Sequence, residues 1–262
     1  MFEFFLGLIL LGIFAGLLSG FFGIGSGVIL VPAFVFLFNL LDFPSEIIPI
    51  LATGTSMTTM AITIPMASYI HYKNKNVNLD MVKKMFWMGF IMTFSGRYIA
   101  LFIQSSTLQI IIAVSLILAA IQIAFNFSPK SQNRETSTIE LVIVSGIIGL
   151  ITSFVGIGGG ILLIPYFKYR GLSIHEAIGT SSLMGLAFAT SGALGALLFA
   201  PIEAIEINGL YNSAYIPAVL ITGLTSVYFA RLGANLAART ESNNLRFAFS
   251  ILVILAALRV FY

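Results

Sequence analysis

Two related stretches decide the fold of this chain: Gly23-Ile24-Gly25-Ser26-Gly27, followed by Pro32, and Gly156-Ile157-Gly158-Gly159-Gly160, followed by Pro165. Each copy lies inside an apolar segment that is longer than the roughly 20 residues of one membrane crossing. Apolar segments interrupted by glycine at corresponding places in two halves of a chain are typical of transporters built from repeats. Glycine in this setting lets the backbone turn and present bare N–H groups. The two copies therefore predict a duplicated site.

The composition indicates an integral membrane protein. Of 262 residues, 58% are hydrophobic and only 9% are charged, whereas about 25% of the residues of a soluble domain are charged. The longest polar stretch, residues 128–138, is too short for a soluble catalytic domain. The N-terminal Met1-Phe2-Glu3 lacks the basic region of a signal peptide, so we expect the apolar segment after it to be retained.

Cysteine is absent, and the two histidines are His71 and His175. Disulfides and thiolate metal sites are therefore excluded, and a histidine metal cluster is not expected. The sequence thus predicts no metal and no cofactor. The net charge of +3 says little about partners, because basic residues in membrane proteins chiefly record orientation. No nucleic-acid partner is predicted.

Hydropathy divides the chain into apolar segments. In order, these are Phe4–Leu40, Ile47–Ile70, Met85–Ile103, Leu108–Phe127, Leu141–Tyr169, Ala177–Ala200, Gly209–Ala230 and Leu245–Phe261. The first and fifth contain the glycine copies, whereas each of the others fits a single crossing of ~30 Å of hydrocarbon. Each long segment is either one tilted span with a tail or a hairpin that folds back at the glycines.

The 13 Lys and Arg residues decide between these alternatives. All but Arg97 and Arg259 gather after the second segment, in the central linker, and after the fifth and seventh segments, at Lys73, Lys75, Lys83, Lys84, Lys130, Arg134, Lys168, Arg170, Arg231, Arg239 and Arg246. The connections Asn39–Glu46, Gln104–Thr107 and Pro201–Asn208 contain none. By the positive-inside rule the first set is cytoplasmic and the second lies outside. The fifth segment then begins and ends in the cytoplasm and must fold back, and the first must fold back from the outside.

The predicted fold is an all-α integral membrane protein of two inverted repeats. Each repeat is a glycine-broken re-entrant hairpin, or two short helices, followed by three transmembrane helices. Residues 1–127 form the first membrane repeat, residues 128–137 a cytoplasmic linker, and residues 138–262 the second membrane repeat. We expect a multi-pass protein of the cell inner (plasma) membrane with both termini outside.

The hairpin arms are expected to be short. As helices, Phe4–Gly20 and Leu141–Ser153 would be only ~25 and ~20 Å long, which favours arms that meet near the midplane. Two short full crossings would satisfy the same charge pattern. Because the residue before a proline is pushed toward extended backbone, Val28–Val31 and Ile161–Ile164 are predicted to be partly extended.

The hairpin tips are the leading candidate binding site. Free N–H groups and the positive end of the dipole at a helix start favour anions. The predicted substrate-binding residues of the tips are Gly23, Gly25, Ser26, Gly27, Gly156, Gly158, Gly159 and Gly160. The alternative is that glycine here only permits close helix packing.

Hydroxyl groups and one arginine complete the candidate site. The runs Gly54-Thr55-Ser56 and Gly179-Thr180-Ser181 place hydroxyl donors inside neighbouring helices, where they either bind an anion or serve helix contacts. Arg97 lies about six residues, or ~9 Å, inside the third segment, so it is either an anion ligand or a side chain that reaches the outer interface. Arg231 is interpreted as an orientation charge.

No Asp or Glu lies in the body of a predicted crossing, so a buried carboxylate relay is not expected. A tyrosine or His71 could still relay protons. For an anion that moves outward, the membrane potential itself supplies about 2.3 kcal/mol per charge per 100 mV. An enzyme is not predicted, because Gly23–Gly27 lacks the Gly-Lys-Ser/Thr of a P-loop and Ser26 becomes Gly159 in the second copy.

The residues Gly16–Gly27 with Pro32, the copy that ends at Pro165, and the helix starts at Leu108 and Leu245 resemble the TauE/SafE family of sulfite and organosulfonate exporters. The resemblance covers essentially the whole chain and implies export of sulfite, sulfoacetate or a related small sulfur-containing anion. Ser26 stands where a third glycine is common in this family.

We therefore expect a secondary transporter that exports such anions by alternating access. Its expected partners are the anion and the lipid bilayer, and a homodimer is left open. The alternatives are a passive anion channel and a non-transporting membrane assembly or metal-uptake component.

Overall fold

The computed structural model describes residues 2–22, 25–125, 137–201, 207–237 and 243–260. The first half contains α1 (Phe2–Phe22), α2 (Gly27–Leu40), α3 (Ile48–Lys73), α4 (Leu79–Ala100) and α5 (Ser105–Phe125). The second half contains α6 (Thr138–Val155), α7 (Gly160–Tyr169), α8 (Ile174–Leu198), α9 (Ile216–Ala237) and α10 (Asn243–Arg259). The predicted helical class is confirmed. The predicted linker, residues 128–137, lies outside the described residues except for Ser137.

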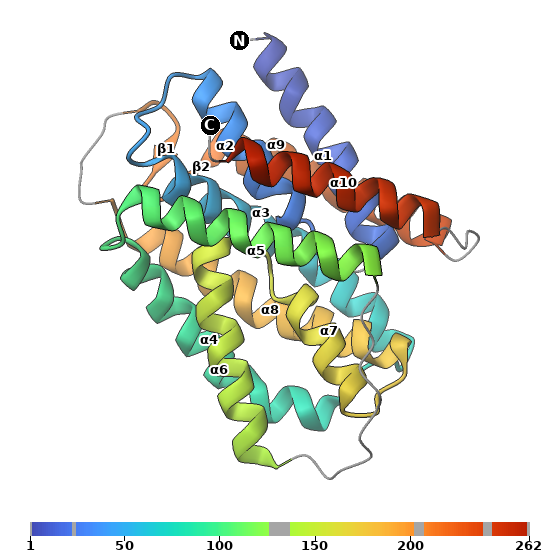
Figure 1. Cartoon of the computed structure of the whole chain (residues 1–262). Helices are drawn as coiled ribbons and strands as arrows, with labels where there is room; N and C mark the ends of the chain where they lie inside the picture. Colours follow the sequence, from blue (N-terminus) through green and yellow to red (C-terminus); the bar gives the residue numbers. More distant parts are fainter. Residues whose placement is uncertain (1, 23–24, 126–136, 202–206, 238–242, 261–262) are drawn as a thin grey trace.

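Helix packing follows the same plan in both halves (Figure 1). The first helix of each half packs along the fourth helix of the other, so that α1 lies on α9 and α6 lies on α4. The third helices, α3 and α8, pack on each other, as do the last helices, α5 and α10. This exchange of partners is what a duplicated chain predicts. The inverted orientation of the halves in a membrane stays a prediction.

Glycines bring the backbones of the exchanged pairs into contact. A Cβ built at Gly16 of α1 would lie 2.6 Å from the Ser226 carbonyl oxygen of α9, and one at Gly149 of α6 would lie 2.7 Å from the Gly89 carbonyl oxygen of α4. At the contact between α4 and α6, Thr93 Oγ1 also donates a hydrogen bond to the Gly149 carbonyl at 3.0 Å. Close packing therefore accounts for these glycines, as small residues do between membrane helices.

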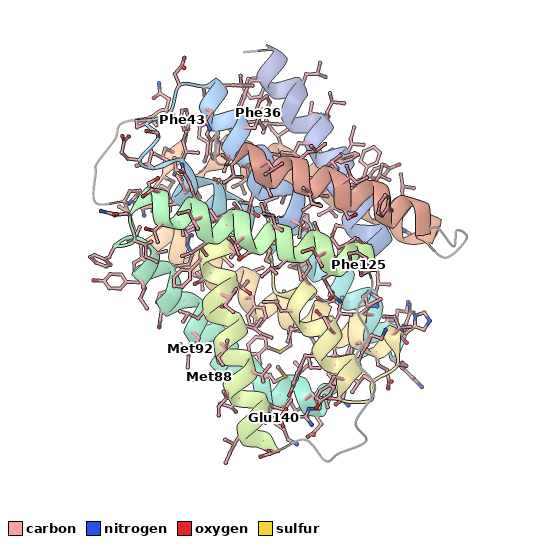
Figure 2. The ribbon with its side chains drawn as sticks, viewed as in Figure 1. Phe36, Phe43, Met88, Met92, Phe125 and Glu140 are labelled. Atoms are coloured by element: carbon pink, nitrogen blue, oxygen red, sulfur yellow. The ribbon has the colours of Figure 1, made fainter. Side chains whose placement is uncertain are left out.

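Five helices of the described chain are long and apolar enough to cross a membrane: α3, α5, α6, α8 and the stretch Ile216–Gly233 of α9. Large apolar side chains also cover the outside of the bundle, such as Phe125, which Figure 2 labels, and Leu224, which are 70% and 66% exposed. An apolar exterior of this kind suits lipid rather than water. The chain is thus a multi-pass membrane protein.

The fifth apolar segment folds back at its glycines, as predicted. Glu140, near the start of α6, forms an ion pair with Arg170, directly after the end of α7. Tyr166 Oη also donates a hydrogen bond to Glu140 Oε1 at 3.0 Å. Both ends of the segment therefore lie at one face of the molecule.

The predicted arms of the hairpins are corrected in two ways. The first arms are longer than expected, because α1 has 21 residues and α6 has 18. The stretches Val28–Val31 and Ile161–Ile164 are helical, so the prediction of extended backbone there is wrong. Pro32 and Pro165 lie inside α2 and α7. Each proline is the sixth residue of its helix, where it removes the hydrogen bond to the carbonyl four residues before it, yet the helix continues on both sides of it.

The region before α9 also differs from the prediction. Instead of one apolar crossing from Gly209 to Ala230, a small antiparallel hairpin, β1 (Leu210–Tyr211) and β2 (Ala214–Tyr215), precedes the helix. Leu210 pairs with Tyr215, and Tyr211 with Ala214. The helix then continues past Ala230 to Ala237. Apolar residues in two-residue strands carry no hydropathy signal of their own, so the sequence did not separate them from the helix.

Candidate functional site

The tips of the two hairpins touch each other at the centre of the molecule. A Cβ built at Gly27 would clash with the Gly156 carbonyl oxygen and lie 2.6 Å from the Ile157 Cα. Gly159, the residue before α7, has a φ of +75°, and a Cβ there would lie 2.5 Å from the Phe188 ring. Glycine has no Cβ, so it avoids these contacts at both positions, and it adopts the positive φ of Gly159 without strain. The repeated glycines therefore build one joint centre from two halves of the chain.

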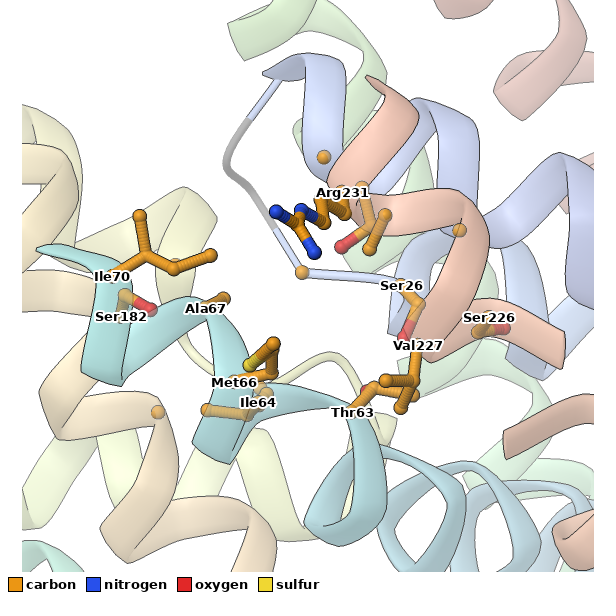
Figure 3. A pocket seen from close by; sticks show the side chains of 18 of the residues that line it. Ser26, Thr63, Ile64, Met66, Ala67, Ile70, Ser182, Ser226, Val227 and Arg231 are labelled. Carbon is orange, nitrogen blue, oxygen red and sulfur yellow. The ribbon is translucent and has the colours of Figure 1, made fainter. Parts of the chain in front are cut away.

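A cavity of about 90 Å³ lies beside this centre (Figure 3). Since a cavity needs about 10–15 Å³ to hold one water molecule, this volume can take several waters or one small ion. Its polar lining comes from helices of both halves and consists of hydroxyl groups and glycine backbone. The hydroxyl residues are Ser19, Ser26, Thr63, Ser181, Ser182 and Ser226.

The starts of α2 and α7 both border the cavity. Gly25 and Ser26 precede α2, and Gly158 and Gly160 flank the start of α7; all four line the cavity. The first N–H groups of a helix have no partner inside the helix. Together with the positive end of each helix dipole, they favour a negatively charged ligand.

Two buried hydroxyl groups in the cavity wall have no hydrogen-bond partner among the described residues. They are the Oγ atoms of Ser26 and Ser181, and each residue is only 1% exposed. An unsatisfied buried polar group costs about 1–3 kcal/mol. A ligand or water with oxygen atoms in the cavity would remove that cost.

The threonines of the two Gly-Thr-Ser runs have a different task, because each holds a loop of the other half. Thr55 Oγ1 accepts a hydrogen bond from the N–H of Tyr215 at 3.0 Å, and Thr180 Oγ1 accepts one from the N–H of Asn78 at 2.9 Å. Ser56 donates to the Gly156 carbonyl at 2.9 Å and so fixes the second tip. Thr55, Ser56 and Thr180 do not line the cavity.

Arg97 is buried away from the cavity. It is 1% exposed, and its guanidinium donates to Thr53 Oγ1 at 2.8 Å, to the Ile50 carbonyl at 3.2 Å and to the Ser153 carbonyl at 3.4 Å. The interpretation that this side chain reaches the outer interface is therefore wrong. No carboxylate of the described residues pairs with Arg97, and its Nε has no partner there.

Arg231 is the functional candidate that the sequence interpretation missed. It lines the cavity and points into it from α9 (Figure 3). The apolar segment stops at Ala230, which favours an orientation charge, but α9 continues for a further turn and more. Opposite it, the wall includes the apolar side chains of Ile64, Ala67 and Ile70 together with Ser182.

The predicted site residues thus fall into groups. Those that line the cavity are Gly25, Ser26, Gly158, Gly160 and Ser181. Those that pack the tips are Gly27, Gly156 and Gly159, and those that hold other parts of the fold are Thr55, Ser56, Arg97 and Thr180. Gly23 lies outside the described residues. Among the described residues there is no group of three or more His, Cys, Asp or Glu that could hold a metal ion.

The spans, the apolar exterior and the central polar cavity between two related halves define a membrane transporter. The sequence profile of the family described as Sulfite exporter TauE/SafE matches residues 8–260, so the chain belongs to that family.

Relatives match over nearly the whole chain. A probable membrane transporter protein of Haemophilus influenzae is 29% identical over 100% of this chain and 99% of its own length. One of Methanocaldococcus jannaschii is 30% identical over 93% of this chain and 90% of its own length. The YunE protein of Bacillus subtilis, also a probable membrane transporter, is 21% identical over 97% of this chain and 96% of its own length. No solved structure gives a significant match.

Proposed function

We propose that this transporter exports a small sulfur-containing anion, such as sulfite, sulfoacetate or a related organosulfonate, by alternating access. The observation that carries the proposal is the cavity where two helix starts and the unpartnered hydroxyls of Ser26 and Ser181 meet. Donors without acceptors suit the oxygens of an oxyanion. That the central atom of this anion is sulfur is inferred only from the description of the family.

The shape of the path supports an inward-facing state. The cavity extends from the tips to Ile70 and Arg231, near ends of α3 and α9 that the charge pattern assigns to the cytoplasm. On the other side of the tips, the hydrogen bond between Thr55 and Tyr215 and the bonds of Arg97 tie the helices together. In this state a cytoplasmic anion would reach the site, and export requires that the outer contacts open next.

The proposal includes a plasma-membrane location with both termini outside, and no enzymatic activity. Arg231 is the single Asp, Glu, His, Lys, Arg or Tyr among the described lining residues. An always-protonated guanidinium is a poor general acid or base, so the cavity is suited to binding rather than catalysis.

Flux into proteoliposomes under an imposed potential tests the proposal. We expect saturable movement of sulfite, sulfoacetate or sulfolactate, together with counterflow of labelled substrate. Flux that does not saturate and shows no counterflow would identify a passive anion channel instead. If all three anions move no faster than through empty liposomes, the sulfonate proposal is wrong.

A further inference from the structure

We propose that Arg231 is the residue that selects for negative charge at the inner mouth of the cavity and makes the first strong contact with the incoming anion. The inference rests on the proposed function of the cavity as the transport site. It assigns the charge selection to one side chain, whereas helix starts and hydroxyl groups bind without a fixed charge.

The position of Arg231 carries this inference. It is exposed, it lies near the cytoplasmic end of α9, and its guanidinium is directed toward the space between α9 and the Ala67–Ile70 face of α3 (Figure 3). No other described lining residue is charged. A lone charge in a cleft with low-dielectric walls raises the local concentration of the opposite ion.

The guanidinium is also free to bind. No ion pair or hydrogen bond with another described residue engages Arg231. The other arginines of the described core are occupied: Arg170 pairs with Glu140, and Arg97 is bonded to Thr53. Arginine offers two parallel N–H donors that match the oxygens of a sulfonate or carboxylate.

The absence of acidic side chains opposite Arg231 strengthens the selection. Ile64, Ala67 and Val227 line the passage between Arg231 and the hydroxyl groups of the tips, and no described lining residue is Asp or Glu. A cation would meet the positive guanidinium and two positive helix ends, whereas an anion meets only favourable charge. Arg231 therefore acts on capture, and its removal should change the apparent KM more than the maximal rate.

The change in apparent KM can be measured from the transport of sulfoacetate that is added to one face of the membrane. In proteoliposomes with the cytoplasmic face accessible, Arg231→Gln should raise the apparent KM about fivefold, the size expected when a partly screened charge pair is lost, with a maximal rate within about twofold. Arg231→Lys should keep most of the affinity. Lys83→Gln is the matched control, because it removes an exposed cytoplasmic-side charge that does not line the cavity. The KM of the wild type should rise with ionic strength, and that rise should be absent in Arg231→Gln.

The outcomes separate the two proposals. If the wild type moves neither sulfoacetate nor sulfite, the proposed function fails. If the wild type transports but Arg231→Gln has an unchanged KM, or if Lys83→Gln changes the KM equally, the inference about Arg231 is wrong. Calorimetric titration of sulfoacetate into the detergent-solubilised variants gives the affinity without any dependence on orientation, and a loss confined to Arg231→Gln would support the inference.

Discussion

Arg97 and Arg231 lie on α4 and α9, the helices that take the same place in the two halves, yet their surroundings are opposite. Arg97 is 1% exposed and donates to three oxygen acceptors of α3 and α6. Arg231 is exposed, lines the cavity and has no ion-pair partner among the described residues. The difference shows that the guanidinium of Arg97 ties helices together, whereas that of Arg231 borders the cavity. Two related halves in unlike states are what alternating access requires.

The serines of the two Gly-Thr-Ser runs repeat this contrast on a smaller scale. Ser56 donates to the Gly156 carbonyl, whereas the Ser181 Oγ, on the equivalent part of α8, has no partner and faces the cavity. The same three-residue motif thus supports a tip in one half and places an unpartnered hydroxyl group in the cavity wall in the other.

Removal of Arg97 should have the largest effect on the fold. Arg97→Met removes the hydrogen bonds that the guanidinium donates to Thr53 Oγ1 and the Ile50 carbonyl, and should lower stability by about 2–4 kcal/mol. Arg231→Met should change stability by less than about 0.5 kcal/mol, since it removes only an exposed side chain. Thermal unfolding in detergent compares the two variants. Equal melting temperatures would contradict the contrast between the two arginines.

Disruption of the contact between the tips should have the next largest effect on stability. Gly27→Ala forces a methyl group into the Gly156 carbonyl and the Ile157 backbone, and should cost about 1–3 kcal/mol. Gly7→Ala in α1 is the control, because its Cβ would meet only Leu37 Cδ2 at an ordinary 3.7 Å. Melting temperatures again give the comparison. A Gly27→Ala protein as stable as Gly7→Ala would mean that the tips are not in contact.

Replacement of Ser56 and of Ser181 by alanine should affect stability differently. Ser56→Ala loses a buried hydrogen bond and should lower stability by about 1 kcal/mol. Ser181→Ala removes an unsatisfied hydroxyl and should leave stability unchanged or raised, while it weakens sulfoacetate binding. Parallel melting and titration experiments test both. Loss of stability in Ser181→Ala without loss of affinity would exclude Ser181 as a ligand.

The smallest effect, and the one expected to be equal in both halves, concerns the loop contacts. Thr55→Val and Thr180→Val each remove the acceptor of one loop N–H, and each should cost about 0.5–1.5 kcal/mol. The two variants should agree within error because the two bonds are equivalent. A large difference between them would show that the halves are less alike than their packing suggests.

Much of the fold could be predicted from the sequence, because runs of apolar residues locate the helices and the glycine clusters locate the breaks between them. The apolar segments correspond to helices, and the basic residues Lys168 and Arg170 revealed the fold-back of the segment that holds α6 and α7. The predictions failed where local preference was weak. Proline did not delay the start of α2 or α7, and the strands at Leu210–Tyr215 have the composition of the helix that follows.

The site could be predicted only in part, since the roles of its residues depend on distant partners. Thr55 binds the N–H of Tyr215, which is 160 residues away, and Ser56 reaches Gly156 over 100 residues. No sequence pattern separates Ser181 from Ser56. The sequence does not identify Arg231 as a site residue, because the apolar segment ends at Ala230 although the helix continues to Ala237.

The central claim is that Ser181 faces an anion site that is open to the cytoplasm. The chain has no native cysteine, so Ser181→Cys provides a single thiol, whose rate of reaction with a membrane-impermeant, anionic methanethiosulfonate can be measured from each side. The account predicts that the thiol reacts from the cytoplasmic face and that sulfoacetate slows the reaction in a saturable way. Reaction only from the outer face, or a rate that sulfoacetate does not change, would contradict it.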